Sequence, residues 1–218
     1  MRYIIVKIIG VPLLIIFMNL GFILIAREVF SNRTTLLPIL LLNVFICIDI
    51  IIRPISAKKD EYNRFIVTIS FLSMPIWFTL PYYEFKVLMA RILSTFVLNW
   101  VSIIGTVLMT LGGLLLLLNR IYLGKYGGPK LVIEEEHRLI TTGLYQYIRH
   151  PMYSGFLLLF FGYSLSFGSI VITIAISVVF FLIFKTRMDI EEKLLISEFG
   201  EEYSSYIKRT KRLFPLLY

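Results

Sequence analysis

A polar stretch over residues 143–155 holds the densest group of side chains that could do chemistry. Three tyrosines, an arginine and a histidine lie directly before a long apolar run, namely Tyr145, Tyr147, Arg149, His150 and Tyr153. Polar groups at the edge of a membrane span cost free energy unless they bind something, so they indicate a functional site. Such a rim could receive a water-soluble cofactor, with the tyrosines stacking on a purine or facing a cation. An interfacial aromatic belt with a proline cap is the alternative interpretation.

A second group lies beyond the apolar run, where Arg187 and Glu191 are four residues apart and share one face of a helix. They could form an ordinary intrahelical ion pair, or they could hold the charged parts of two ligands. The planar fork of an arginine suits a carboxylate, whereas a glutamate suits an ammonium group or ribose hydroxyls. Asp49 and Arg53 have the same spacing. The simpler interpretation is an ion pair at the end of the second span, with the charged groups extended to the membrane interface.

Metal and nucleic-acid chemistry find little support in the sequence. His137 and His150 are the two histidines, and neither a CxxC nor an HExxH motif occurs. Cys47 is the single cysteine and lies in an apolar run, where a lone thiol is usually part of the packing. The basic residues are scattered among loops rather than gathered on one helix, so we expect neither a metal nor a nucleic-acid partner.

The composition requires a lipid environment for much of the chain. Of its 218 residues, 58% are hydrophobic, and the mean hydropathy is +0.83. A chain of this length cannot bury so much apolar surface in one water-soluble core. The 18 phenylalanines and 13 tyrosines suit lipid-facing packing and interfacial anchoring. The formal net charge of +8 fits basic loops that face the cytosol and anionic headgroups.

These observations predict an all-α integral membrane protein with about six hydrophobic helices. Because a span needs about 20 mostly apolar residues, we expect four spans at about 4–26, 35–52, 65–83 and 93–118. A C-terminal helical hairpin should follow at about 152–165 and 169–188, broken by glycines and serines between residues 162 and 169. Gly105, Gly112 and Gly113 should permit close helix contact in the fourth span.

Two polar regions complete the expected layout. Residues 119–150 should form a small hairpin or an irregular lid on the membrane face. The tail from Glu191 is predicted to be an amphipathic helix, interfacial or cytosolic, that is interrupted at Gly200. The apolar N-terminal stretch is too long for a typical signal peptide and lacks a small-x-small cleavage site, so we expect a retained first span. The lysine and arginine bias places the polar segment and the tail in the cytosol.

Five pieces of sequence, taken in order, resemble the isoprenylcysteine carboxyl methyltransferase family and its phospholipid methyltransferase relatives. The pieces are residues 139–145, residues 149–155, Arg187 with Glu191 and Glu192, residues 199–203 and residues 212–215. Each piece is weak alone, and their order and separations make the set specific. The first four spans carry no recognisable motif.

The resemblance implies a multi-pass membrane enzyme that uses S-adenosylmethionine, in a prokaryotic cell membrane or the endoplasmic reticulum, with its site facing the cytosol. Residues 1–118 would form an N-terminal four-span region, and residues 119–218 a methyltransferase region. Arg187 would meet the carboxylate of a lipidic substrate, which the resemblance implies to be an isoprenylcysteine-like α-carboxylate. The cofactor site would be lined by His137, Leu139, Ile140, Tyr145, His150, Pro151, Met152, Tyr153 and Glu191.

Other functions stay open at this point. The acceptor could be a phospholipid amine or a small isoprenoid acid, although an arginine is unhelpful beside a cationic amine. Sterol-type reductases that use NADPH carry a similar Arg-His-Pro region, but they usually continue with Asn-Tyr and then Gly-Glu, and this chain has Met152 and Phe156 in place of the two polar residues. A scaffold or small transporter without catalytic activity is the third possibility.

Overall fold

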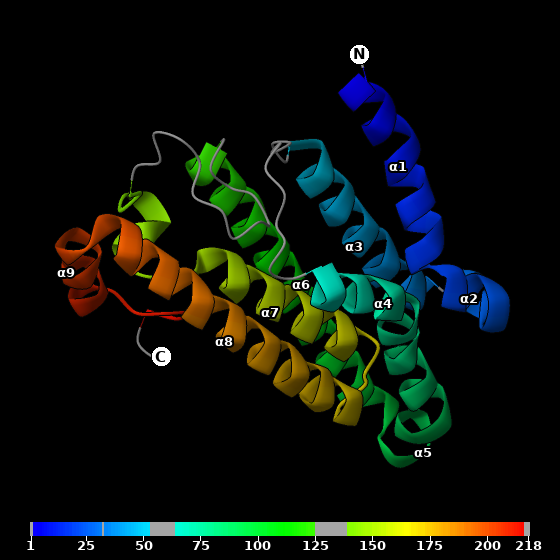
Figure 1. The fold of residues 1–218 in the computed structure, drawn as a ribbon. Helices are drawn as coiled ribbons and strands as arrows, with labels where there is room; N and C mark the ends of the chain where they lie inside the picture. Colours follow the sequence, from blue (N-terminus) through cyan, green and yellow to red (C-terminus); the bar gives the residue numbers. More distant parts are fainter. Residues whose placement is uncertain (1, 32, 53–63, 125–138, 216–218) are drawn as a thin grey trace.

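The computed structural model describes residues 2–31, 33–52, 64–124 and 139–215, and all the regular elements in these ranges are helices (Figure 1). The longer helices are α1 (Arg2–Met18), α3 (Arg33–Ile52), α4 (Arg64–Glu84), α6 (Thr95–Leu123), α7 (Pro151–Ser166) and α8 (Val171–Phe199). The shorter ones are α2 (Leu20–Ile25), η1 (Arg27–Ser31), η2 (Phe85–Met89), α5 (Ala90–Ile92), η4 (Gly143–Gln146) and α9 (Glu201–Arg209).

Three helices of the described chain are long and apolar enough to cross a membrane: α3 over Thr35–Ile52, α6 and α8. The all-α integral membrane fold expected from the sequence is confirmed. The number of spans stays a prediction, because α7 has only 16 residues and α4 contains two prolines, Pro75 and Pro81.

The first span is not one continuous helix as expected. It ends at Met18, and α2 begins after Asn19, whose side-chain amide donates to the carbonyl of Ile15 at 2.8 Å and to Oδ1 of Asn43 at 3.0 Å. An asparagine can satisfy neighbouring backbone groups with its side chain and thereby interrupt a helix. The hydropathy of the stretch carries no sign of this break.

The C-terminal hairpin forms close to its predicted bounds, with α7 over Pro151–Ser166 and α8 from Val171, but the second helix runs to Phe199 instead of ending at about residue 188. Gly162 and Ser164 lie inside α7, and the chain turns at residues 167–170, where Gly168 has a φ of 75°. The hydroxyl of Ser164 accepts from Thr173 at 2.8 Å, so this serine joins the two helices instead of breaking the first. The second helix continues beyond residue 188 to Phe199 because its polar end pairs with other parts of the chain, as described below.

The antiparallel helices α6 and α7 are held in close contact by glycine. A Cβ added to Gly162 would lie 2.2 Å from the backbone nitrogen of Met109, and one added to Gly112 would lie 2.4 Å from that of Leu159. Any larger side chain would therefore separate the two backbones. The close contact predicted for the fourth span is confirmed, and it fixes the start of α7 against the end of α6.

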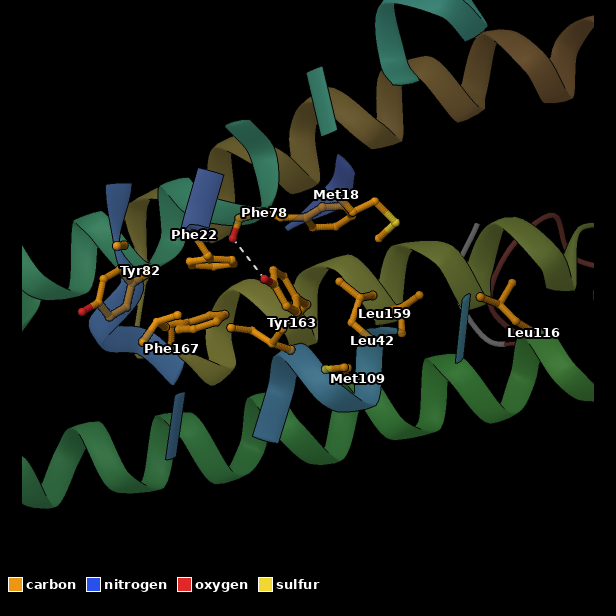
Figure 2. Packing of buried hydrophobic residues seen from close by; sticks show 13 residues of the cluster. Met18, Phe22, Leu42, Phe78, Tyr82, Met109, Leu116, Leu159, Tyr163 and Phe167 are labelled. Carbon is orange, nitrogen blue, oxygen red and sulfur yellow. Dashed lines mark hydrogen bonds between the residues drawn. The ribbon is translucent and has the colours of Figure 1, made fainter. Parts of the chain in front are cut away.

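A buried apolar cluster ties these helices to the N-terminal ones. Figure 2 shows Phe22, Phe78 and Phe167 around Tyr163, whose hydroxyl donates to the carbonyl of Phe78 at 3.0 Å. Met18, from the end of α1, is buried in the same cluster. Helices from both halves of the sequence thus form one core.

The far end of α8 is fixed to α4 by Glu84. Its carboxylate accepts from the backbone nitrogens of Val171 at 2.9 Å and Ile172 at 2.7 Å, and from the hydroxyl of Ser169. A carboxylate at a helix N-terminus satisfies free N–H groups and complements the helix dipole. This cap anchors α8 at the end opposite the polar residues described next.

Candidate functional site

Three segments meet at the polar end of the helices: the start of α7, the end of α8 and the C-terminal residues 210–213 (Figure 1). The backbone nitrogen of Arg149 donates to the carbonyl of Lys211 at 2.8 Å, and that of His150 donates to the carbonyl of Arg212 at 3.0 Å. The C-terminal segment is thereby fastened in parallel beside residues 147–150. Residues 125–138, which hold most of the segment expected to form a small hairpin or an irregular lid, lie outside the described residues, so that expectation stays a prediction.

Glu192 is the centre of a charged network that joins these segments. Its Oε1 lies 3.0 Å from Nε of Arg149 and 3.0 Å from Nε2 of His150. Its Oε2 lies 3.1 Å from Nη2 of Arg212, which also pairs with Asp189 at 2.5 Å. The side chain of Glu192 is only 15% exposed, so the carboxylate is held by charge-assisted hydrogen bonds rather than by water.

Glu191 faces the first turn of α7. Its Oε2 accepts from the hydroxyl of Tyr153 at 3.1 Å and lies 3.9 Å from Nδ1 of His150. The charge of Arg187 also acts on the Tyr153 hydroxyl. The ring of Tyr153 is buried against Phe184, with centroids 5.2 Å apart. Tyr153 therefore connects Glu191 with Arg187, and both lie on the face of α8 that is turned towards α7.

Tyr145 belongs to a buried hydrogen-bonded group behind the network. Its hydroxyl donates to Oδ1 of Asn119 at 2.6 Å, and its carbonyl accepts from the hydroxyl of Tyr206 at 2.7 Å. Burial raises the pKa of Tyr145 and raises the pKa of Tyr206 to about 12, so both hydroxyls stay protonated donors near neutral pH. Nδ2 of Asn119 is buried and has no hydrogen-bond partner within the described ranges.

A buried ion pair joins α3 and α6. Nε of Arg120 donates to Oδ1 of Asp49 at 2.6 Å, and the Arg120 side chain is 3% exposed. Arg53, the partner suggested for Asp49 by spacing, lies outside the described residues. Burying an arginine without a charged partner costs folding free energy, so the pairing with Asp49 stabilises Arg120 at this position.

A cavity of about 450 Å³ extends from this polar end into the apolar interior. Its polar lining residues are Asp49, Arg120, Tyr153 and Arg187. Its apolar walls come from α1, α3, α4, α6, α7 and α8, and include Leu14, Phe45, Met74, Phe78, Leu116, Phe160 and Phe180. The N-terminal helices, which carry no motif, therefore supply much of the wall. The arrangement suits a ligand with an anionic head and an apolar tail.

The structure brings together most of the residues predicted for the site. His150, Tyr153 and Glu191 are in contact, and Pro151 is the first residue of α7. Met152 and Arg187 line the cavity. Tyr145 is behind the network, while Leu139 and Ile140 are half-buried at the start of the last described range. His137 lies outside the described residues. The role of each in binding stays a prediction.

Sequence reasoning missed the parts of this arrangement that depend on contacts between distant residues. The sequence motif includes Glu192 but does not predict its contacts with Arg149, His150 and Arg212. Asn119 and Arg120 fall in the predicted polar segment 119–150, whereas in the structure they lie in the last turns of α6. Arg120 carried a usable signal, because a charged residue next to an apolar run is a functional candidate by default. Its partner, Asp49, is 71 residues away and could not be identified locally.

The comparisons with known proteins agree with the motifs. Residues 100–202 match the family model described as phospholipid methyltransferase. The protein-S-isoprenylcysteine O-methyltransferase of Schizosaccharomyces pombe (strain 972 / ATCC 24843) is 37% identical over 83 residues, which are 38% of this chain and 35% of the relative. The protein-S-isoprenylcysteine O-methyltransferase B of Arabidopsis thaliana is 34% identical over 120 residues, or 54% of this chain and 61% of the relative.

A solved structure shares the fold over almost the whole chain. It is titled as the structure of the eukaryotic intramembrane Ras methyltransferase ICMT (isoprenylcysteine carboxyl methyltransferase) without a monobody, and it matches with a TM-score of 0.65. The match covers 97% of this chain and 75% of that one, at 23% identity. The chain therefore shares the fold of that integral membrane protein. The predicted resemblance to the isoprenylcysteine and phospholipid methyltransferases is confirmed, although the chain spans less than two thirds of the length of the two curated relatives.

Proposed function

We propose that this chain transfers a methyl group from S-adenosylmethionine to the carboxylate of an isoprenylcysteine-like lipid, at the cytosolic face of the membrane. The observation that carries the proposal is the cavity whose apolar body ends at Arg187 and Tyr153, beside Glu191. The names of the two curated relatives, both isoprenylcysteine O-methyltransferases, give the proposal its acceptor class.

The acceptor fits the cavity by charge and by polarity. An apolar tail would replace water along the walls, which is favourable in proportion to the apolar area covered. The carboxylate would meet Arg187, whose planar guanidinium can bind one oxygen and leave the other free to attack. A phospholipid amine would instead bring another cation close to Arg187, at an end where Arg120 is already paired with Asp49. This charge favours the carboxylate acceptor.

The residues present also fit the methyl donor. Glu191 is 33% exposed, and its carboxylate can complement an ammonium group or ribose hydroxyls. The buried Nδ2 of Asn119, without a hydrogen-bond partner in the described chain, offers a donor to an acceptor atom of a ligand. Tyr153, His150 and Met152 would hold the donor between these two ends. When bound, S-adenosylmethionine supplies an electrophilic methyl group on a sulfonium.

The chemical work left to the protein is alignment and exclusion of water. An α-carboxylate has a pKa of about 3.5 and is ionised at neutral pH, so the acceptor needs no general base. Holding both reactants in line converts a bimolecular reaction into an effectively unimolecular one. The network around Glu192 locks α8 to the start of α7 and so fixes Arg187 and Glu191 relative to Tyr153.

A methyl-transfer assay with the full chain in lipid nanodiscs tests the proposal. Labelled S-adenosylmethionine is offered with an S-farnesyl cysteine analogue, with phosphatidylethanolamine, and with a membrane extract. We expect label in a base-labile ester of the cysteine analogue. Label in the phospholipid amine alone would replace the carboxylate acceptor with an amine, and no transfer to any acceptor would refute the methyltransferase assignment.

A further inference from the structure

A second, smaller cavity lies beyond the first one. It has a volume of about 250 Å³ and lies between α4, α7 and α8, where Trp77, Tyr163 and Ile176 line it but not the main cavity. The two cavities share five lining residues, Met74, Phe78, Phe160, Phe180 and Ile183, of which Phe160 and Phe180 come from α7 and α8 and stack on each other. These two phenylalanines therefore stand in the common wall.

Part of the common wall is an aromatic stack contributed by α7 and α8. The rings of Phe160 and Phe180 are stacked, with centroids 4.5 Å apart and an angle of 22° between planes. Trp77 lies on the far side, with its ring centroid 6.5 Å from that of Phe180. On the near side, Phe184 lies 5.7 Å from Phe180 and continues to Tyr153. An aromatic row thus runs from the polar end of the main cavity into the second cavity.

The position of Phe180 along α8 determines how far the stacked rings lie from Arg187 at the polar end of the main cavity. Phe180 is seven residues from Arg187, which corresponds to about 10 Å along a helix axis, and Ile176 is about 16 Å away on the same rule. Consider a lipid whose head group is bound by Arg187 and whose tail is longer than the main cavity. To reach the space around Ile176, this tail must displace the stacked rings.

We propose that Phe160 and Phe180 set the length of lipid tail that the chain accepts, with the second cavity as the space used by tails that pass them. This inference rests on the proposed function, because it assumes that Arg187 holds the acceptor head. Removing one ring should widen the passage between the two cavities, with Met74, Phe78 and Ile183 as the rest of the shared wall, and should favour the longer tail. One extra or missing methylene in a hydrophobic pocket changes kcat/KM by roughly 10- to 200-fold, so a change of a whole isoprene unit should give a measurable shift.

The test compares methyl transfer to S-farnesyl and S-geranylgeranyl cysteine analogues, which differ by one isoprene unit. We expect Phe180→Ala to raise the kcat/KM ratio in favour of the geranylgeranyl analogue by about tenfold, and Phe160→Leu to raise it by less. Phe180→Trp should lower the ratio. The matched control is Val178→Ala, because Val178 lies on the same helix, lines neither cavity and is 54% exposed.

Tryptophan fluorescence gives a readout that does not depend on turnover. The chain has 2 tryptophans, and Trp100→Phe, at a side chain that is 54% exposed, leaves Trp77 as the single reporter. A geranylgeranyl analogue with bromine at its distal end should quench Trp77 more strongly in Phe180→Ala than in the parent protein. Quenching close to a bulk-lipid level in both proteins would show that the tail does not enter the second cavity.

The outcomes separate this inference from the proposed function. Transfer to both analogues with an unchanged ratio in all three variants would overturn the role of the stack and leave the methyltransferase assignment intact. Absence of transfer to either analogue by the parent protein would refute the isoprenylcysteine acceptor, and the length-setting role would fall with it.

Discussion

The hydroxyl of Tyr153 lies 3.1 Å from Oε2 of Glu191, and this hydrogen bond joins the first turn of α7 to the polar end of α8. It places the side of the site expected to bind the methyl donor directly beside the mouth of the apolar cavity, which Tyr153 also lines. The bond therefore orients Glu191, while the charge of Arg187 acts on the same hydroxyl. Its removal should affect donor binding more than acceptor binding.

Tyr153→Phe keeps the ring against Phe184 and removes only the hydroxyl. Because one hydrogen bond contributes about 1 kcal/mol, we expect the KM for S-adenosylmethionine to rise about fivefold with little change in the KM for the acceptor. Steady-state kinetics with each substrate varied in turn would show this. Tyr147→Phe is the control, since Tyr147 is 64% exposed. Equal changes in both KM values would contradict the assignment of this bond to the donor side.

Glu191→Ala should weaken binding of the methyl donor. Loss of a charge-assisted hydrogen bond costs about 1.5–3 kcal/mol, which corresponds to a rise of about 10- to 100-fold in Kd. Isothermal titration calorimetry with S-adenosylmethionine measures this change directly. Glu198→Ala, at an exposed position of the same helix, should leave the Kd unaltered. A Kd that is the same in both variants would remove Glu191 from the site.

Glu192→Ala should destabilise the fold more than any other single carboxylate change in this region. The substitution leaves Arg149, His150 and Arg212 close together with little exposure to water. Breaking a buried charged network by removing one partner costs about 3–5 kcal/mol. Thermal unfolding in detergent should show a large fall in the midpoint, compared with almost none for the exposed Glu202→Ala. A midpoint within a degree or two of the parent protein would mean that the network contributes little.

Gly162→Ala tests the close packing of α6 on α7. The added methyl group would clash with the backbone of Met109, and such overpacking costs about 1–3 kcal/mol. Gly10→Ala is the matched control because an added Cβ there meets nothing within 4 Å. Unfolding by titration with sodium dodecyl sulfate should separate the two variants. If both unfold at the same detergent fraction, the two backbones are not in the close contact described here.

The sequence was sufficient for features that depend on local pattern. Apolar runs of sufficient length predict α3, α6 and α8, and glycines on one face of the fourth span predict its close contact with a neighbour. Breaks that depend on a single side chain were harder to predict. The first apolar run is divided into two helices at Asn19, whose side chain donates to Asn43 on another helix, and hydropathy contains no information on that partner.

The candidate site was predictable only as far as the motifs reach. Tyr153 and Glu191 could be placed together through the family resemblance, but the pairing of Asp49 with Arg120 could not. The i, i+4 spacing predicts Arg53 as the ion-pair partner of Asp49, whereas the observed partner is Arg120, on a helix much later in the chain. Buried ion pairs are set by which helices meet, and that information lies in tertiary contacts rather than in spacing.

The most direct measurement of the central claim is the effect of Arg187→Ala on methyl transfer and on donor binding in the same preparation. Arg187 is assigned to the acceptor carboxylate, so transfer to an S-farnesyl cysteine analogue should fall below detection while the Kd for S-adenosylmethionine stays within about threefold, a difference under about 0.7 kcal/mol. Lys193→Ala, an exposed change on the same helix, should alter neither quantity. Undiminished transfer by Arg187→Ala, or an equal loss of transfer and donor binding, would contradict the account.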